Sequence, residues 1–359
     1  MESLKNQFFN YSFYSQLTQH VKEVYPKLNV TDFRGAFDAH EKLELMDRVK
    51  QVGDVLFEVL PGTYLDKLHY IKELGPKITG FQGIALPYFV QQYGLDYFDE
   101  SMDALHYLTR FSTAEFAIRP FLKQNLERSL ELIYTWAKDE NNHVRRLASE
   151  GTRPYLPWSF KLDEVRDNPQ LTLPILNTLQ SDADLYVKKS VGNHLNDLSK
   201  NHPQLVVDTV SNWSPVNKHS QWMAKRGVRT LIKDGFAPAF AIMGFEKLPQ
   251  FVVENFKVEN NTVQMGQSLE FSFVIKSEKT TNQKLNIDFQ IFYLKSNGKH
   301  QPKVFKLKEL DLGAKETLTI AKKQLFKDFT TRKHYMGTHF VSLLINGVAV
   351  EKLRFELIA

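Results

Sequence analysis

The chain has 359 residues, of which 42% are hydrophobic and 24% charged, an ordinary balance for a soluble globular protein with room for two separate cores. It contains no cysteine, which excludes a disulfide framework, a cysteine-ligated zinc site and an iron–sulfur cluster. The formal net charge of +5 is a mild excess, compatible with a polyanionic partner but insufficient to identify one.

The beginning of the chain and its apolar runs bear on where the protein acts. The N-terminal residues show no basic stretch that leads into an apolar one, so we expect no secretory signal. Apolar runs such as 237–243 are far too short to span a bilayer. We therefore expect a soluble, cytoplasmic protein with no membrane partner.

The first two thirds of the chain show the periodicity of helices. Apolar side chains recur at spacings of three and four residues, as at Leu126, Leu130 and Ile133. Short polar stretches such as 139–142 separate helical segments of about 10–17 residues. This pattern continues to about Lys247 and predicts an all-α domain.

A sequence repeat lies inside the helical part. The stretch 139–146 resembles 182–189, and the equivalent residues Val144 and Val187 lie 43 positions apart. That period is typical of HEAT-like helix pairs, and a weaker third copy covers 220–226. We therefore predict a HEAT-like repeat solenoid, an α-α superhelix with a concave binding face.

The second helix of each predicted pair carries basic residues at equivalent places. In a solenoid these residues form a stripe that is suited to following a phosphate backbone, although a row of solvated helix faces gives the same pattern. The predicted DNA-binding residues are Arg145, Arg146, Lys188, Lys189, Lys225, Arg226, Arg229 and Lys233.

From about Pro249 the period changes to that of strands. Apolar and polar residues alternate in stretches such as 269–274 and 287–291. About seven short strands in roughly 110 residues predict an all-β immunoglobulin-like sandwich. The predicted domains are therefore a helical domain over 1–247 and a sandwich over 248–359.

Two dipeptides mark hairpins in the predicted sandwich. They are Asn297-Gly298 and Asn346-Gly347. Both central positions of a type I′ turn need positive φ, which asparagine and glycine tolerate best.

Glu115 is the first candidate for chemistry. With Ser112 it fits a capping box, and with Arg119 it has the spacing of an ion pair within a helix. Spacing alone favours a structural role for this carboxylate.

Glu150 is the second candidate, and a surface ion pair with Arg146, one turn earlier, is the simplest interpretation. The loop that follows contains two prolines and a glycine, which end the helix and stiffen the surroundings of Arg153, Tyr155 and Trp158. Large aromatic side chains in such a loop belong to a core more often than to a ligand site.

Asp197 is the third candidate. It shares a helix face with Asn193 and Asn196, which is typical of a solvent-facing side. His194 has no helical partner at metal spacing, so we predict no ligand role for it and no metal site.

Common catalytic motifs are missing. The sequence contains no phosphate-binding loop, dinucleotide fingerprint, zinc-protease motif or serine-hydrolase elbow, and no helix–hairpin–helix glycine motif. The residues alone thus indicate a curved basic solenoid with several acidic and aromatic candidates.

These candidates also carry a resemblance. The chain resembles the AlkC family of DNA-alkylpurine glycosylases over essentially its whole length, and the helical segments that carry it are specific jointly and in this order. They are 116–121 after Glu115, 149–154 with Trp158, and 187–193 with Asp197. The tail is similar to the subgroup with an appended Ig-like domain through 297–299, 302–307 and 330–335.

The resemblance implies a base-excision-repair enzyme that hydrolyses the N-glycosidic bond of cationic N3-methylated bases, 3-methyladenine and also 3-methylcytosine. It implies HEAT-like repeats around duplex DNA that contains alkylated bases, and catalysis without conventional base flipping. It assigns the acidic site to Glu115, Glu150 and Asp197, and an aromatic wall to Trp158. We expect Tyr155 and Arg153 of the same loop to contact the lesion as well.

The implied chemistry needs no metal or nucleotide cofactor. A 3-methylated base already carries positive charge and leaves without protonation, while the sugar develops oxocarbenium character. Fixed carboxylates stabilise that charge, and one of them positions or deprotonates water. Glu150 is the favoured candidate for water activation, although the sequence does not separate the three roles. A solenoid that wraps DNA can act as a monomer.

The alternative is a non-catalytic scaffold in which the repeats and the Ig-like domain bind nucleic acid or a protein partner, because fold does not decide function. Acidic residues among basic repeats favour the enzyme. Carboxylates repel DNA and benefit the site only where positive charge forms.

Overall fold

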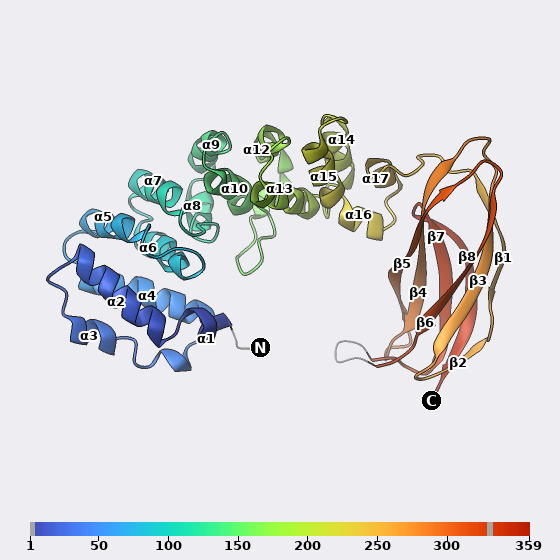
Figure 1. Cartoon of the computed structure of the whole chain (residues 1–359), viewed down its shortest axis with the longest axis horizontal. Helices are drawn as coiled ribbons and strands as arrows, with labels where there is room; N and C mark the ends of the chain where they lie inside the picture. The colour runs from blue at the N-terminus through green and yellow to red at the C-terminus, as the bar shows by residue number, and fades with distance from the viewer. Residues whose placement is uncertain (1–3, 329–332) are drawn as a thin grey trace. The chain divides into compact units, whose positions relative to one another are not determined.

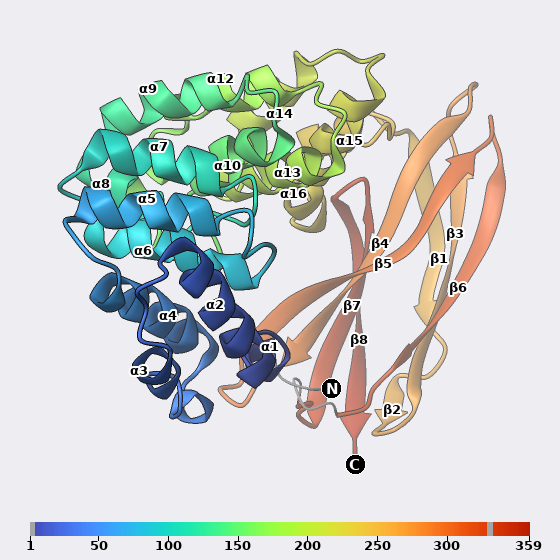
Figure 2. The same cartoon turned by 60° about the vertical axis from the view of Figure 1, so that its left-hand side comes forward.

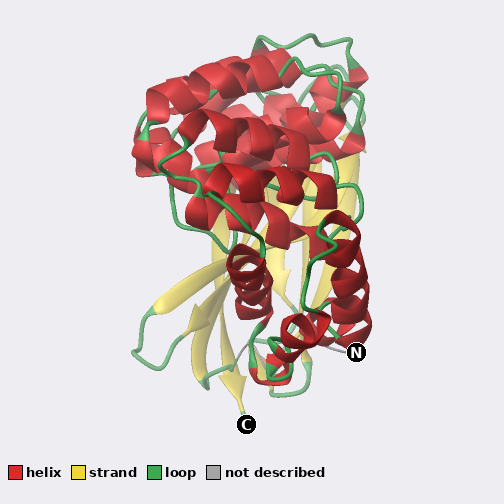
Figure 3. Cartoon of the chain, turned by 90° about the vertical axis from the view of Figure 1, so that its left-hand side faces the viewer, coloured by secondary structure: helices red, strands yellow, loops and turns green. Residues whose placement is uncertain are grey.

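The computed structural model describes residues 4–328 and 333–359, and it forms two compact units. The first unit comprises Met1–Asn201 with Asn217–Met223, and the second comprises His202–Val216 with Ala224–Ala359. Thr330, Thr331 and Arg332 of the tail segment named above lie outside the described residues. Figure 3 shows that helices and strands occupy separate parts of the chain.

Helices make up the first unit, and the helical region continues into the second. The helices are α1 (Leu4–Phe8), α2 (Tyr11–Val24), α3 (Val30–Gly35), η1 (His40–Lys42), α4 (Leu45–Val59), α5 (Tyr64–Leu74), η2 (Gln82–Ile84), α6 (Ala85–Tyr93), α7 (Phe98–Leu108), α8 (Arg119–Gln124), α9 (Leu126–Trp136), α10 (Asn142–Gly151), α11 (Asp163–Asp167), η3 (Pro169–Leu171), α12 (Leu173–Leu179), α13 (Leu185–Leu198), α14 (Pro203–Ser211), α15 (Lys218–Gly227), α16 (Arg229–Lys233) and α17 (Ala237–Ile242). No described helix is both long enough and apolar enough to cross a membrane.

The helices of the first unit lie in two layers. Figure 1 shows α5, α7, α9 and α12 following one another in one layer, and α4, α6, α10 and α13 in the other. Contacts join the layers through α6 with α7, α9 with α10, and α12 with α13. Within the second layer α10 packs along α13, and this pair positions the site described below.

Apolar packing and capping set α10 and α13 side by side. Val144 of α10 and Val187 of α13 are fully buried. The Asn141 side chain accepts a hydrogen bond from the His143 N–H at 2.9 Å where α10 begins, and Asp184 accepts one from the Tyr186 N–H at 2.7 Å where α13 begins. The repeated sequence therefore starts two neighbouring helices in the same way.

The strands form two sheets. They are β1 (Phe251–Val258), β2 (Thr262–Gln264), β3 (Ser268–Ser277), β4 (Gln283–Leu294), β5 (His300–Leu312), β6 (Thr317–Leu325), β7 (Gly337–Ile345) and β8 (Val348–Ile358). One sheet has the order β1-β3-β6 and the other β2-β8-β7-β4-β5, and every described pair is antiparallel except β2 with β8.

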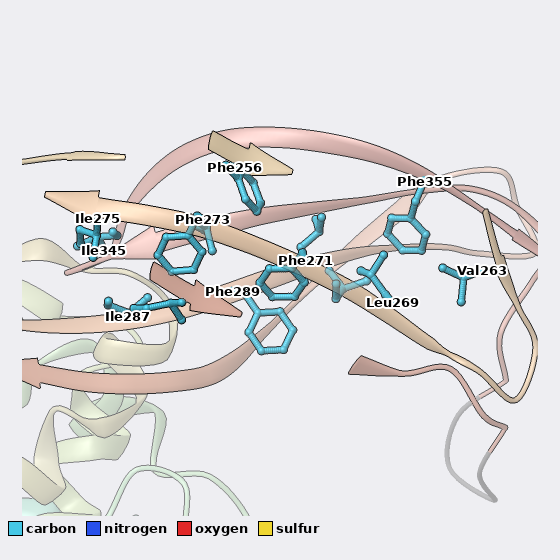
Figure 4. Packing of buried hydrophobic residues seen from close by; sticks show 14 of the residues in the cluster. Phe256, Val263, Leu269, Phe271, Phe273, Ile275, Ile287, Phe289, Ile345 and Phe355 are labelled. Atoms are coloured by element: carbon cyan, nitrogen blue, oxygen red, sulfur yellow. The ribbon is translucent and has the colours of Figure 1, made fainter. Parts of the chain in front are cut away.

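Phenylalanines from both sheets fill the core of the β-domain. Phe271 of the smaller sheet packs against Phe289 of the larger one with ring centroids 5.2 Å apart, and Phe273 and Phe355 belong to the same buried cluster (Figure 4). All four are buried, because the alternation of each strand turns one face inward.

The two predicted hairpin dipeptides take different turns. At Asn346-Gly347 both residues have positive φ, 47° and 80°, as a type I′ turn requires. In the loop between β4 and β5 only Gly298 does, and its N–H donates to the Lys295 carbonyl at 2.9 Å. The type I′ expectation was therefore wrong at Asn297, because this loop makes its turn one residue earlier.

The change from helix to strand lies between Ile242, the end of α17, and Phe251, the start of β1. The compact units divide the chain elsewhere, since α14, α16 and α17 belong to the second unit. Gly347 and Gly235 show why: a Cβ added to Gly347 would lie 2.6 Å from the Gly235 carbonyl oxygen. The boundary at 247/248 remains a prediction for independently folding domains.

Candidate active site

Three buried carboxylates gather at one end of the α10–α13 pair. Glu150 lies in the last turn of α10, Asp197 in the last turn of α13, and Glu115 in the turn that precedes α8. Their exposed fractions are 6%, 3% and 8%. Contacts with shared arginines, described next, bring all three predicted acidic residues into one cluster.

Two arginines connect the carboxylates. Arg146 donates to Glu115 and lies 3.6 Å from Glu150. Arg153 donates through Nη1 to Glu150 Oε1 at 2.6 Å and through Nε to Asp197 Oδ2 at 2.8 Å. We call these five residues the acid–arginine cluster, in which negative and positive groups alternate.

The surroundings shift the pKa values of Glu115 and Glu150 in opposite directions. Burial raises the pKa of Glu115, and Arg146 offsets only part of that effect. Burial also acts against the charge of Glu150, but Arg146 and Arg153 together outweigh it and lower the pKa of Glu150. Glu115 is therefore the more basic of these two carboxylates.

The local interpretation of Glu115 was wrong. Ser112 donates to the Gly80 carbonyl at 2.8 Å instead of capping a helix, and Glu115 precedes α8. Arg119 donates to the carbonyls of Gly151 and Arg153 at 3.1 and 2.8 Å. Partners distant in the sequence replace the neighbours that spacing suggested.

The surface interpretations of Glu150 and Asp197 were also wrong. The predicted pairing of Glu150 with Arg146 exists but is buried, and Asp197 lies inside instead of facing solvent. Lys200 covers the second oxygen of Asp197, with Nζ 2.9 Å from Oδ1. Each helix face is buried because the neighbouring elements cover it, which helical spacing does not reveal.

The loop after α10 presents an exposed aromatic side chain. Trp158 is 67% exposed and has a φ of 65°, which is uncommon for a residue other than glycine. Trp158 therefore does not follow the general tendency of such aromatic side chains to lie in a core. Tyr155 is half-buried, and its hydroxyl donates to Asn201 at 2.6 Å while the Lys200 ammonium lies 4.7 Å from its ring centroid.

Arg145 and Arg146 do not lie on an exposed basic stripe. Arg146 is buried in the acid–arginine cluster. Arg145 donates to Asp182 at 2.6 Å and to the carbonyls of Asp139 and Glu140, so it fastens α10 to the turn before α13. Both residues were expected on an exposed basic stripe. Their guanidinium groups instead bind carboxylates and backbone carbonyls of the protein itself.

The other predicted DNA-binding residues are more accessible. Lys188 is half-buried, with Nζ 3.2 Å from His219 Nδ1, and Lys189 is exposed. In the second unit Lys225 and Lys233 are exposed, whereas its two predicted DNA-binding arginines are half-buried. These are Arg226 and Arg229.

His194 and Lys200 were not predicted as parts of this site. His194 is fully buried, with Nδ1 3.0 Å from the Ser149 carbonyl and Nε2 3.3 Å from the Thr172 hydroxyl. Burial, with Arg153 nearby, lowers the pKa of His194 from 6.5 to about 3, so it stays neutral. The three-residue spacing of Asp197 and Lys200 was the signal that could have revealed the lysine. Among the described residues, no group of three or more histidine, aspartate and glutamate side chains is arranged to hold a metal ion.

Comparison with known proteins places the chain in a family. Residues 103–231 match the family model described as DNA alkylation repair enzyme, and residues 252–359 match the one described as uncharacterised protein YhaZ, C-terminal Ig-like domain. The chain is 39% identical over 358 residues to uncharacterized protein YhaZ of Bacillus subtilis (strain 168), covering 99% of each. It is 40% identical to the solved structure of Pseudomonas fluorescens alkylpurine DNA glycosylase AlkC bound to DNA containing an abasic site analog, with a TM-score of 0.84 and 100% coverage of both chains.

The chain therefore belongs to the AlkC family of DNA alkylation repair enzymes, in the form with a C-terminal Ig-like domain. The resemblance noted in the sequence is confirmed, as is an all-α region followed by an Ig-like β-domain.

Proposed function

We propose that this protein is a DNA glycosylase of base excision repair, which hydrolyses the N-glycosidic bond of cationic N3-alkylated bases in duplex DNA without conventional base flipping. 3-Methyladenine is the proposed substrate, with 3-methylcytosine as a second one. The observation that carries the proposal is the gathering of Glu115, Glu150 and Asp197 in one buried cluster. The solved relative that supports it is an alkylpurine DNA glycosylase bound to DNA containing an abasic site analog.

The chemistry suits such a cluster. An N3-alkylated base leaves as a neutral molecule once the bond to the sugar breaks, so no proton donor is needed. The deoxyribose then carries the positive charge, and nearby fixed carboxylates stabilise it in a water-poor site. Trp158 is exposed in the loop that follows α10, the helix that contains Glu150, and it can stack on the cationic base or sugar.

The contacts favour Glu115 over Glu150 as the carboxylate that activates water. Asp197 has cations on both of its oxygens, and two arginines approach Oε1 of Glu150. Glu115 binds one arginine, and its raised pKa makes it a better proton acceptor in its ionised form. We therefore assign water activation to Glu115, and charge stabilisation to Glu150 and Asp197.

The helical region supplies the proposed DNA-binding surface. The two layers of helices and the repeated α10 and α13 starts support HEAT-like pairs. Exposed Lys189, Lys225 and Lys233 are the proposed phosphate contacts, because exposed ammonium groups can replace the counterions of DNA. A monomer is sufficient for this arrangement.

Release of free base from DNA that contains 3-methyladenine tests the proposal. We expect release by the wild type and a loss on the order of 100-fold or more in Glu115→Gln, Glu150→Gln and Asp197→Asn. Glu131→Gln, an exposed change on α9, is the matched control. A wild type that binds this DNA but releases no base would leave the non-catalytic scaffold as the remaining function.

A further inference from the structure

We propose that Arg146 and Arg153 are positioning residues of this site, which hold the three carboxylates from separate segments in one place. This inference rests on the proposed glycosylase function. It replaces the DNA contact and the lesion contact that the sequence suggested for these two arginines.

Arg153 joins the ends of α10 and α13. Its Nε and Nη2 both lie 2.8 Å from Asp197 Oδ2, and its Nη1 lies 2.6 Å from Glu150 Oε1. Its own carbonyl accepts a hydrogen bond from Arg119 Nη1 at 2.8 Å, so backbone and guanidinium are both held. The planar guanidinium matches two carboxylates at once, which a lysine ammonium cannot reproduce.

Arg146 joins α10 to the turn that contains Glu115. It donates to the Glu115 carboxylate and to the Thr113 hydroxyl at 2.7 Å, and its other Nη lies 3.6 Å from Glu150. The Tyr186 ring of α13 covers the guanidinium, with the ring centroid 4.6 Å from Cζ. Residues from three segments therefore orient this side chain.

Burial argues against a direct phosphate contact for either arginine. Arg146 and Arg153 are 8% and 7% exposed, and their donors are directed at carboxylates. A buried ion pair also adds little net stability, because desolvation of the charges cancels most of their attraction. Holding the carboxylates in place is the benefit that remains.

The proposal has a consequence for the pH dependence of the reaction. Glu150 is faced by Arg146 of its own helix, Arg153 of the loop, Glu115 of the turn, and Tyr186 and His194 of α13. Removing one arginine leaves the other alone to offset burial and the charge of Glu115, so the pKa of Glu150 rises. Because the reaction needs both Glu115 and Glu150 ionised, the acidic limb of the rate profile moves to higher pH once the pKa of Glu150 exceeds that of Glu115.

The test uses the full chain with Arg153→Gln, Arg153→Lys and, as a matched exposed ion pair, Arg128→Gln, whose partner is Asp99. Single-turnover release of 3-methyladenine is measured between about pH 5 and pH 9, together with affinity for undamaged duplex. We expect Arg153→Gln to slow release by about 100-fold, to move the acidic limb upward and to keep its duplex affinity. Arg153→Lys should recover part of the release rate and should have its acidic limb at the wild-type pH. Arg128→Gln should have the release rate, acidic limb and duplex affinity of the wild type.

Three outcomes would overturn the positioning role. They are a weaker duplex affinity with an unmoved acidic limb in Arg153→Gln, an unchanged release rate in that variant, and a full wild-type rate in Arg153→Lys. The lysine variant carries the test if the glutamine variant does not fold. If the wild type itself releases no base, the proposed function fails, whereas an active wild type with unaffected variants removes only the positioning role.

Discussion

The protein buries carboxyl groups in two regions, and the two regions treat them differently. In the β-domain Asp288 lies beside Asn286, whose amide donates to it at 2.6 Å, and burial raises the pKa of Asp288. In the helical unit Glu150 has Arg146 and Arg153 as partners, and its pKa is lowered despite similar burial. Burial dominates at Asp288, whose side-chain hydrogen-bond partner is a neutral amide, whereas two guanidinium groups outweigh burial at Glu150.

The surrounding interiors differ in the same way. Phenylalanines such as Phe271 and Phe289 fill the β-domain, where burial of apolar surface stabilises the fold. The end of the α10–α13 pair instead collects three carboxylates and two arginines, whose burial costs free energy unless every charge is paired. The first interior serves stability, and the second is where we expect catalysis.

The largest expected effect on stability comes from the apolar interior. Phe289→Ala removes a fully buried ring between the sheets and should lower the free energy of unfolding by about 4 kcal/mol. Urea denaturation measures the loss, with the exposed Val348→Ala as control. A loss no larger than that of the control would mean that this core does not stabilise the β-domain.

Removing one charge from the acid–arginine cluster should lower stability nearly as much, and removing its partner as well should reverse most of that loss. Arg146→Met leaves Glu115 without its cation and should cost about 3 kcal/mol. Adding Glu115→Leu removes the unpaired charge and should restore most of the stability, while release of base stays abolished. A double variant that remained active would contradict the contrast between the two interiors.

A smaller loss of stability is expected from a substitution at Gly347, where the turn before α17 approaches the β7–β8 hairpin. In Gly347→Ala the new Cβ would lie 2.6 Å from the Gly235 carbonyl oxygen, at a residue whose φ is 80°. We expect a loss of about 1–3 kcal/mol in thermal unfolding. Gly298 has a φ of 74° but open space around it, so Gly298→Ala measures only the cost of placing an alanine at positive φ. Equal losses in the two variants would show that the close approach contributes nothing.

His194 should make the helical unit sensitive to acid. Because its folded pKa of about 3 lies below the unfolded value of 6.5, it is neutral in both states above pH 6.5 and makes no difference there. Below that pH the unfolded chain binds the extra proton, and stability falls by up to about 1.4 kcal/mol per pH unit toward the folded pKa. Chemical denaturation at several pH values should show a shallower slope in His194→Gln, and an unchanged slope in exposed His69→Gln. The same slope in wild type and His194→Gln would rule out this contribution.

Trp158 should have the smallest effect on stability. Trp158→Ala removes an exposed side chain, so unfolding should change by less than about 0.5 kcal/mol, while base release falls several-fold through loss of the aromatic face. Trp158→Phe keeps an aromatic face and should retain more activity. A large loss of stability would instead return Trp158 to a core role.

Much of the architecture follows from local patterns. Periodicity separates helices from strands near residues 242–251, and the repeat identifies the starts of α10 and α13. These features depend on residues close in the sequence, such as Asn141 with His143. The type I′ turn at Asn346-Gly347 follows for the same reason.

The candidate site residues were predicted from the resemblance to a family more than from the spacing of residues along helices. Helical spacing by itself suggested that Glu115 caps a helix and that Glu150 and Asp197 face solvent, and all three interpretations were wrong. Their actual partners, Arg146 and Arg153, were taken for surface residues. An ion pair between Glu115 and Arg146 joins segments that no local rule connects.

The amino-acid sequence was enough to predict where helices give way to strands, to recognise the family, and to name Glu115, Glu150 and Asp197 as candidate site residues. The burial of these residues, their bridging by two arginines, and the opposite pKa shifts of Glu115 and Glu150 became evident from the folded structure. The reason is that helix starts and strand alternation arise between neighbours in the chain, whereas burial and charge pairing arise from what other segments place against a side chain.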